Sequence, residues 1–140
     1  MTSKDRVARL GSGGPYEDAV GYSRVVAVGD HAWTAGCTAL VDGTMVGEGD
    51  AYAQAVAALL FAVASLGRAG FAAADVVHTR MYVVDVPANA NAVGRAHADV
   101  LGAVRPAATM LGVPGLIDSR MLVEVELVAA RAGAPEGSLG

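Results

Sequence analysis

The sequence is poor in the residues that build metal centres and disulfides. Cys37 is the single cysteine among 140 residues, which excludes a disulfide within the chain and any multi-cysteine metal site. His31 and His78 have no Asp, Glu or Cys at the spacing of zinc ligands. The glycines form neither a Gly-x-Gly-x-x-Gly motif after a strand nor a phosphate loop with lysine. We therefore expect no metal ion and no cofactor.

Charged residues and long apolar runs are also scarce. Asp, Glu, Lys and Arg make up 17% of the chain, the net charge is -4, and the ten Lys and Arg form no basic stripe. Nucleic acid is therefore not an expected partner. The longest uninterrupted apolar run, residues 55–64, is shorter than the ~20 residues that a membrane span needs. The N-terminal residues lack the pattern of a secretory signal, so we expect a cytoplasmic protein that does not enter a membrane.

Hydrophobic residues, by contrast, are abundant. They make up 54% of the chain, and the mean hydropathy is +0.43. A monomer of this length would leave part of that apolar surface exposed, so contact between copies of the chain is the simplest way to cover it. The polar, Gly-rich residues 1–20 and the tail 132–140 are predicted to be flexible. A single domain over 21–131 remains.

Changes in periodicity along that domain predict strands and two helices. Gly29 and Asp30 separate two β-favouring runs and suit a hairpin turn, and Asp42 and Gly43 mark another turn. The predicted elements are strands over 25–28 and 31–35, a helix from Asp50 to Gly67 or Gly70, a strand over 76–84, a helix starting near Pro87, and strands over 109–113 and 120–130. This order provides two helices to cover one face of a sheet.

The last predicted strand carries two carboxylates on one face. Because side chains alternate along a strand, Glu124 and Glu126 lie opposite the apolar residues of that strand. His78, Arg80 and Tyr82 alternate in the same way and would share the face of the glutamates if the two strands are neighbours. A carboxylate pair that is not fully solvated must find a cation, a proton or a ligand. This face is therefore the first candidate for a functional site.

A series of short motifs runs in order from about Gly21 to Arg131. The motifs are Gly21-Tyr22-Ser23, Val28-Gly29-Asp30, Trp33-Thr34-Ala35-Gly36, Tyr52-Ala53-Gln54, Ala74-Asp75-Val76-Val77, Met81-Tyr82-Val83-Val84-Asp85, Arg105-Pro106-Ala107 and Leu122-Val123-Glu124-Val125-Glu126. In this order they resemble the RidA/YjgF superfamily. The resemblance implies an α+β, chorismate-mutase-like two-layer fold, with a mixed sheet covered on one face by two helices. It also implies a homotrimer that binds a small-molecule substrate between subunits and hydrolyses reactive enamines or imines to 2-keto acids and ammonia without a cofactor.

The chain departs from this family at the position that binds the substrate. The family's deaminases carry a Pro-Ala-Arg-Ser element whose arginine holds the substrate carboxylate. The corresponding run here is 106–109, and Ala108 takes the place of that arginine. Arg105 lies three positions earlier, so it cannot be assumed to reach the same pocket. The family's Ser-Gly-Gln loop reads Ala35-Gly36-Cys37. We therefore expect a retained pocket with a changed substrate or reaction.

The candidate catalytic residues are Glu124, Tyr22 and His97. Glu124 keeps the acidic position of the family's last strand and could act as a general acid or base, or could be a structural partner of Arg80. Tyr22 keeps the family's early tyrosine and could donate to a developing oxyanion, or could only hydrogen-bond locally. His97 replaces a family tyrosine on the inward side of its helix, where it could shuttle protons or be an ordinary core residue.

A larger set of residues is expected to contact the substrate. Arg80 is the first candidate to replace the missing carboxylate anchor, ahead of Arg24 and Arg105. The predicted substrate-binding residues are Arg80, Trp33, Ala35, Gly36, Cys37, Ala108, Thr109 and Met110. The leading hypothesis is acid–base proton transfer on a small enamine, imine or carbonyl metabolite, with imine hydrolysis as its main form. The alternatives are a tautomerase, dehydratase or cyclase of a specialised pathway, a non-catalytic trimeric ligand-binding or regulatory module, and a structural partner in a multi-protein complex.

Overall fold

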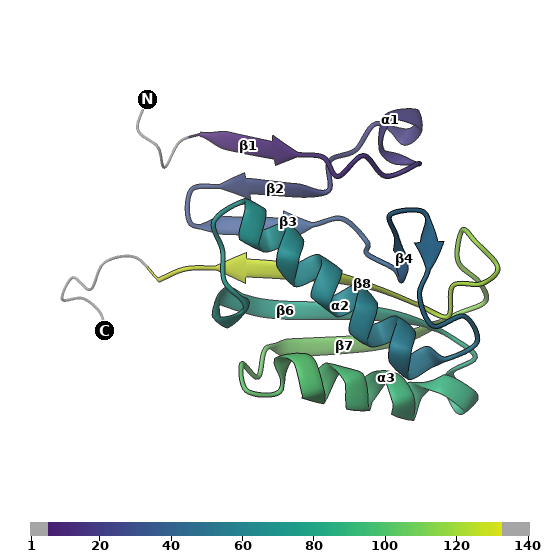
Figure 1. Ribbon diagram of the computed structural model, residues 1–140. Helices are drawn as coiled ribbons and strands as arrows, with labels where there is room; N and C mark the ends of the chain where they lie inside the picture. The colour runs from purple at the N-terminus through teal and green to yellow at the C-terminus, as the bar shows by residue number, and fades with distance from the viewer. Residues whose placement is uncertain (1–5, 133–140) are drawn as a thin grey trace.

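A six-stranded mixed sheet forms the centre of the protein (Figure 1). Its strands are β1 (Val7–Leu10), β2 (Val25–Val28), β3 (His31–Thr34), β6 (Val76–Val84), β7 (Ala107–Val113) and β8 (Val123–Ala130). They lie in the order β1-β2-β3-β8-β6-β7, and only β6 and β7 run parallel. This computed structural model describes residues 6–132, so most of the predicted tail over 132–140 and the first five residues lie outside it.

Two long helices, α2 (Ala51–Arg68) and α3 (Val86–Leu101), lie against the sheet (Figure 1). The remaining elements are short: α1 (Glu17–Val20), the hairpin of β4 (Leu40–Val41) and β5 (Thr44–Met45), and the 3-10 turn η2 (Ala73–Asp75). The prediction of an α+β fold with two helices covering one sheet face is confirmed. The hairpin turn between β2 and β3 and the turn at residues 42–43 are confirmed as well.

The helix α2 forms because its sequence provides a cap at its start, a glycine after its last turn and an apolar side that packs into the core. The Asp50 carboxylate accepts a hydrogen bond from the Ala53 amide at 3.0 Å, as expected of a helix cap. Gly70, just beyond the last turn, adopts a left-handed φ of 89° that other residues rarely take. By length and composition α2 could cross a membrane, yet it packs on the sheet as a core helix. Each of its fully buried leucines contributes about 1.5–3 kcal/mol.

The N-terminal part of the chain corrects one prediction. Residues 7–10 and 17–20, expected to be flexible, instead form β1 and α1, and β1 pairs with β2 along its whole length. The four side chains of β1 are mostly exposed, so the strand shows no alternation of polar and apolar residues. Backbone hydrogen bonds to a neighbouring strand hold it, and such bonds leave no pattern in the sequence.

The sheet face opposite the helices carries the two glutamates, as predicted. Tyr82 pairs with Glu124 and Arg80 pairs with Glu126 in the register of β6 and β8, so these four side chains share one face. Apolar side chains surround them on the same face and leave it partly uncovered within one chain; the most exposed of these are Val7, Val28, Trp33 and Leu111. This is the surface that we call the open face below.

Candidate active site

A pocket of about 710 Å³ lies where the residues just before β2, the chain after β3 and the beginning of β8 meet. Its walls come from residues 12–16, from residues 20, 22 and 24, from residues 35, 36 and 38, from the β4–β5 hairpin, and from residues 117, 121 and 124. One side chain of α2, Phe61, also lines it. The pocket is thus assembled from segments far apart in the sequence. Its volume lies in the range of about 300–1,000 Å³ that is usual for small-molecule sites.

Glu124 lines this pocket and lies directly over Gly36. A Cβ atom at position 36 would be 1.7 Å from Glu124 Oε2, so the absence of a side chain makes room for the carboxylate. Burial raises the pKa of Glu124, the nearby Glu126 carboxylate raises it further, and Arg24 opposes both effects. Among the described residues no cation forms an ion pair with Glu124, because Arg80 pairs with Glu126 at 3.3 Å and Arg24 pairs with Glu17.

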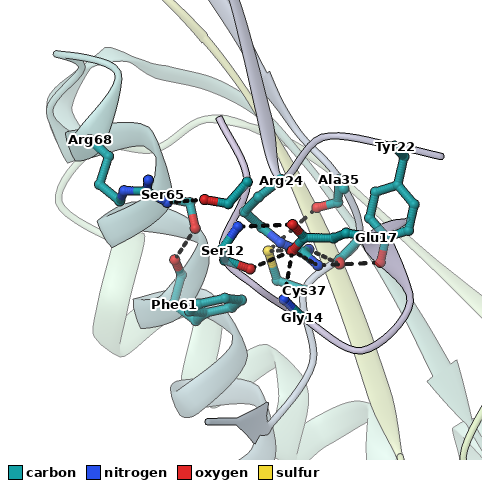
Figure 2. A network of polar contacts seen from close by, with 12 residues as sticks. Ser12, Gly14, Glu17, Tyr22, Arg24, Ala35, Cys37, Phe61, Ser65 and Arg68 are labelled. Atoms are coloured by element: carbon teal, nitrogen blue, oxygen red, sulfur yellow. Dashed lines mark hydrogen bonds and ion pairs between the residues drawn. The ribbon is translucent and has the colours of Figure 1, made fainter. Parts of the chain in front are cut away.

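Arg24 is the cation among the residues that line the pocket, and it is almost entirely buried. Figure 2 shows it beside Glu17 and Tyr22. Its Nη1 donates to the Gly36 carbonyl oxygen at 2.5 Å, and its Nη2 lies 3.4 Å from both Glu17 Oε2 and the Tyr22 hydroxyl. The guanidinium also lies over the rings of Tyr22 and Phe61, with its carbon 5.6 and 5.4 Å from their centroids. Arg24 therefore connects α1, Tyr22 and the segment below Glu124.

Glu17 holds the loop that covers one side of the pocket. Its carboxylate accepts hydrogen bonds from the Ser12 amide at 2.9 Å, the Ser12 hydroxyl and the Gly14 amide at 3.3 Å (Figure 2). Burial opposes ionisation of Glu17, but these hydrogen bonds together with Arg24 outweigh it and lower its pKa. The ion pair of Glu17 with Arg24, 3.4 Å long and buried on both sides, thus joins the loop to the floor of the pocket.

Several residues predicted from the sequence do meet in this pocket. Glu124, Tyr22, Ala35 and Gly36 all line it. Cys37 lies beneath, 3.6 Å from Arg24 Nη1, and burial raises the pKa of its thiol to about 11. A thiol in that state is a poor nucleophile near neutral pH.

Other predicted residues lie elsewhere. Arg80 and Trp33 are on the open face, where Arg80 and Tyr82 both contact Glu126. His97 contacts Thr79 between α3 and β6, with 2.9 Å between Nε2 and Oγ1, and burial lowers its pKa. The remaining predicted contacts with substrate, Ala108, Thr109 and Met110, belong to the edge strand β7 and do not line the pocket of their own chain.

Sequence reasoning missed Glu17 and ranked Arg24 below Arg80. Glu17 lies in a stretch, residues 1–20, whose sequence has no periodic pattern that would predict an ordered element. Arg24 directly precedes β2, and burial of that position could not be read from its neighbours. One signal was present in the sequence: Gly36 follows a predicted strand at a place where no turn requires glycine. A glycine in such a position is typical of a site where another group approaches the backbone closely. Across residues 6–132 no group of three or more His, Cys, Asp or Glu is placed to hold a metal ion.

Comparisons with known proteins agree on one group of relatives. The family model described as Endoribonuclease L-PSP matches residues 15–131. An uncharacterised protein of Streptomyces coelicolor, SCO2049, is 42% identical over 131 residues, which are 94% of this chain and 96% of that protein. The crystal structure of Mycobacterium tuberculosis Rv2704, described as a member of the YjgF/YER057c/UK114 family, is 39% identical with a TM-score of 0.81, over 90% of this chain and 100% of that one. Pseudomonas aeruginosa PA3499, a protein described as of unknown function, is 27% identical with a TM-score of 0.74, over 89% of this chain and 92% of that one.

Proposed function

Since the chain belongs to the RidA/YjgF family, which is also described as endoribonuclease L-PSP, we propose that it is a cytoplasmic, cofactor-independent enzyme that hydrolyses a small reactive imine or enamine. One observation carries this proposal: the half-buried carboxylate of Glu124 lines a pocket of about 710 Å³ and has no ion-pair partner within residues 6–132. Burial raises the pKa of this carboxylate, which makes it a better proton acceptor than a solvated carboxylate and able to return the proton. That is the chemistry that imine hydrolysis needs.

The proposed reaction consumes one water and releases one ammonia for each C=N bond. Glu124 removes a proton from water as the water oxygen bonds to the imine carbon, and this proton passes to the imine nitrogen to give the carbinolamine. Glu124 then removes the proton of the carbinolamine hydroxyl as the carbonyl forms and the C–N bond breaks, and it passes that proton to the departing nitrogen, which leaves as ammonia. An enamine enters the same route after protonation at carbon gives the imine. The base must lie within hydrogen-bond reach of the attacking water.

Tyr22 is proposed to orient the substrate or the water beside Glu124. Arg24 donates to the Tyr22 oxygen, so the hydroxyl hydrogen of Tyr22 is free to point into the pocket that the residue lines. A phenol held in this way can stabilise an oxygen that gains negative charge as the carbinolamine forms.

A non-catalytic binding module is less well supported. Such a module would be expected to neutralise Glu124 with protein groups and leave no room beside it, whereas the carboxylate lines an open pocket. RNA cleavage is not favoured either, because the arginine of the pocket is paired with Glu17 and the chain has a net charge of -4.

The test is hydrolysis of imines generated in situ, from amino acids with an amino-acid oxidase and from primary amines with a flavin amine oxidase. We expect this protein to accelerate carbonyl and ammonia release, and Glu124→Gln to lower the rate by about 10²–10³-fold, as for loss of a general base. Glu126→Gln is the matched control: the same change two residues along β8, at a carboxylate held by Arg80 and Tyr82. Absence of acceleration with every imine, or equal rates for Glu124→Gln and wild type, would reject the proposal.

We also propose that the open face is covered by two further copies of the chain in a homotrimer. The support is its exposed apolar surface, with Trp33 and Leu111 each 43% exposed within one chain. Trp33→Lys should lower the mass measured by light scattering from that of a trimer to that of a monomer. Leu60→Lys is the control: this apolar side chain is 54% exposed on α2, across the sheet from the open face, and its substitution should leave the mass unchanged. A monomeric wild type would refute this part.

A further inference from the structure

We propose that the substrate of this pocket is an imine without a carboxylate, neutral or cationic, that carries an apolar body. This rests on the proposed function, because it places the reacting C=N group beside Glu124. The charged side chains that line the pocket are Arg24, Asp42 and Glu124. Which of these charges a ligand can reach decides the class of substrate.

Arg24 cannot serve as a carboxylate clamp in this arrangement. A guanidinium has five N–H groups, and a clamp uses two parallel ones on one edge. The two terminal nitrogens already contact Gly36 O, Cys37 Sγ, Glu17 and the Tyr22 hydroxyl. The fifth group, Nε–H, is buried in the protein without a partner, so a ligand cannot reach it either. The guanidinium of Arg24 is therefore occupied by Glu17, Tyr22 and the segment 36–37.

The free charges that this chain presents to a ligand are consequently negative. Glu17, 3.4 Å from Arg24, neutralises the charge of that guanidinium. The remaining charged groups of the pocket lining are the carboxylates of Glu124 and Asp42. A substrate carboxylate beside the reacting carbon would approach Glu124, and like charges repel. A protonated imine would instead be attracted by the same carboxylate, and its carbon is the more electrophilic form for attack by water. The electrostatics thus favour an amine-derived imine over an amino-acid-derived one.

The rest of the pocket favours an apolar body on that substrate. Phe61, Met121 and Leu40 line it, and Val20 and Ile117 add apolar side chains that are 69% and 66% exposed without a ligand. A ligand that covers them removes apolar surface from water. A three-carbon imine would leave most of a volume of about 710 Å³ unfilled. A phenyl or branched alkyl group next to the C=N carbon would use it.

The test uses a matched pair of substrates that differ only in the carboxylate. The imines are made from 2-phenylethylamine with a flavin amine oxidase and from phenylalanine with an amino-acid oxidase. We expect the first imine to be hydrolysed with a kcat/KM at least tenfold higher. Calorimetric titration with two stable compounds, 2-phenylethylamine and 3-phenylpropionate, measures binding without hydrolysis, and we expect the amine to bind at least tenfold more tightly.

The outcomes separate this inference from the proposed function. Binding of 3-phenylpropionate that equals or exceeds that of the amine, or a preference for the phenylalanine imine, would overturn the inference even if hydrolysis occurs. Binding of neither compound would overturn it as well, because the pocket would not accept an apolar body. A preference for the amine in binding, with neither imine hydrolysed faster, would support the ligand class and reject the hydrolase.

Charge variants test the reason for the preference. Asp42→Asn should weaken amine binding about two- to threefold, and asparagine tolerates the left-handed φ of 50° at this turn. Asp30→Asn is the control, since it makes the same change of net charge at the hairpin between β2 and β3, outside the pocket lining. Glu17→Gln leaves Arg24 without its carboxylate partner and should raise the affinity for 3-phenylpropionate at least fivefold. Circular dichroism checks that this variant folds. Unchanged affinities in both pocket variants would contradict the electrostatic basis.

Discussion

The position of Glu124 depends on Gly36, and Gly36→Ala tests this directly. A Cβ at this position would be 1.7 Å from Oε2 of Glu124 and 2.7 Å from its Cδ, whereas ordinary contact begins near 3.4 Å. The carboxylate must therefore move by about 1.7 Å, the difference between the first and last of these distances. Gly36 is not among the residues with a left-handed φ, so alanine fits its backbone. The main consequence of the substitution is the displacement of the carboxylate.

The magnitude follows from how strongly catalysis depends on geometry. A misplacement of about 1 Å near reacting groups can lower the rate about 10²-fold. We therefore expect kcat/KM for imine hydrolysis to fall about 10²-fold, which corresponds to about 2.7 kcal/mol of transition-state stabilisation. The free energy of unfolding should fall by no more than the ~1–3 kcal/mol usual for an overpacked site, because the half-buried side chain can turn into the pocket.

The assay combines hydrolysis rates with urea denaturation, and Gly94→Ala is the matched control. Gly94 lies within α3, and a Cβ there would meet nothing within 4 Å. That control should keep its activity and gain about 0.5–1 kcal/mol, because alanine favours a helix more than glycine does. If Gly36→Ala hydrolyses imines within twofold of the wild-type rate, Glu124 does not need its present position and the reasoning is refuted.

Three further substitutions test other parts of the site and core. Glu126→Gln removes a negative neighbour that raises the pKa of Glu124, so the pH below which activity is lost should shift downward in a kcat/KM profile; an upward shift would contradict the cause assigned here. Glu17→Gln should cost about 3 kcal/mol at pH 7, because Arg24 stays buried without its partner. Folding lowers the pKa of Glu17, so the stability that its ionised carboxylate gives the wild type is lost as the pH falls below 4.5. The difference in the free energy of unfolding between Glu17→Gln and the wild type, measured by urea denaturation, should therefore become smaller at low pH. Gln54→Met should cost about 2–4 kcal/mol in urea denaturation, because it leaves three backbone groups of residues 47, 120 and 122 without their hydrogen bonds; a loss below about 1 kcal/mol would mean that water replaces them.

Much of the fold could be predicted because its signals are local. Alternation along 123–130 placed Glu124 opposite the core, since side chains of a strand must point to opposite faces. The cap at Asp50 and the apolar side of α2 were readable for the same reason, because each involves residues within a few positions of one another. The same alternation puts Arg80 and Tyr82 on the face of the two glutamates once β6 and β8 are neighbours, as they are.

The composition of the pocket could not be predicted, because it depends on contacts between distant segments. Glu17, Arg24 and Gly36 lie in three separate segments of the chain, and nothing in the neighbours of each residue indicates that they touch. The alternation along its strand made Arg80 a stronger candidate than Arg24 for binding the substrate, but its position in β6 pairs it with Glu126 on the open face. Local periodicity thus accounts for which face each side chain takes. Which charges are neutralised and which remain free for a substrate was decided only when the folded chain brought a buried carboxylate to a buried guanidinium, because burying either charge alone would be too costly.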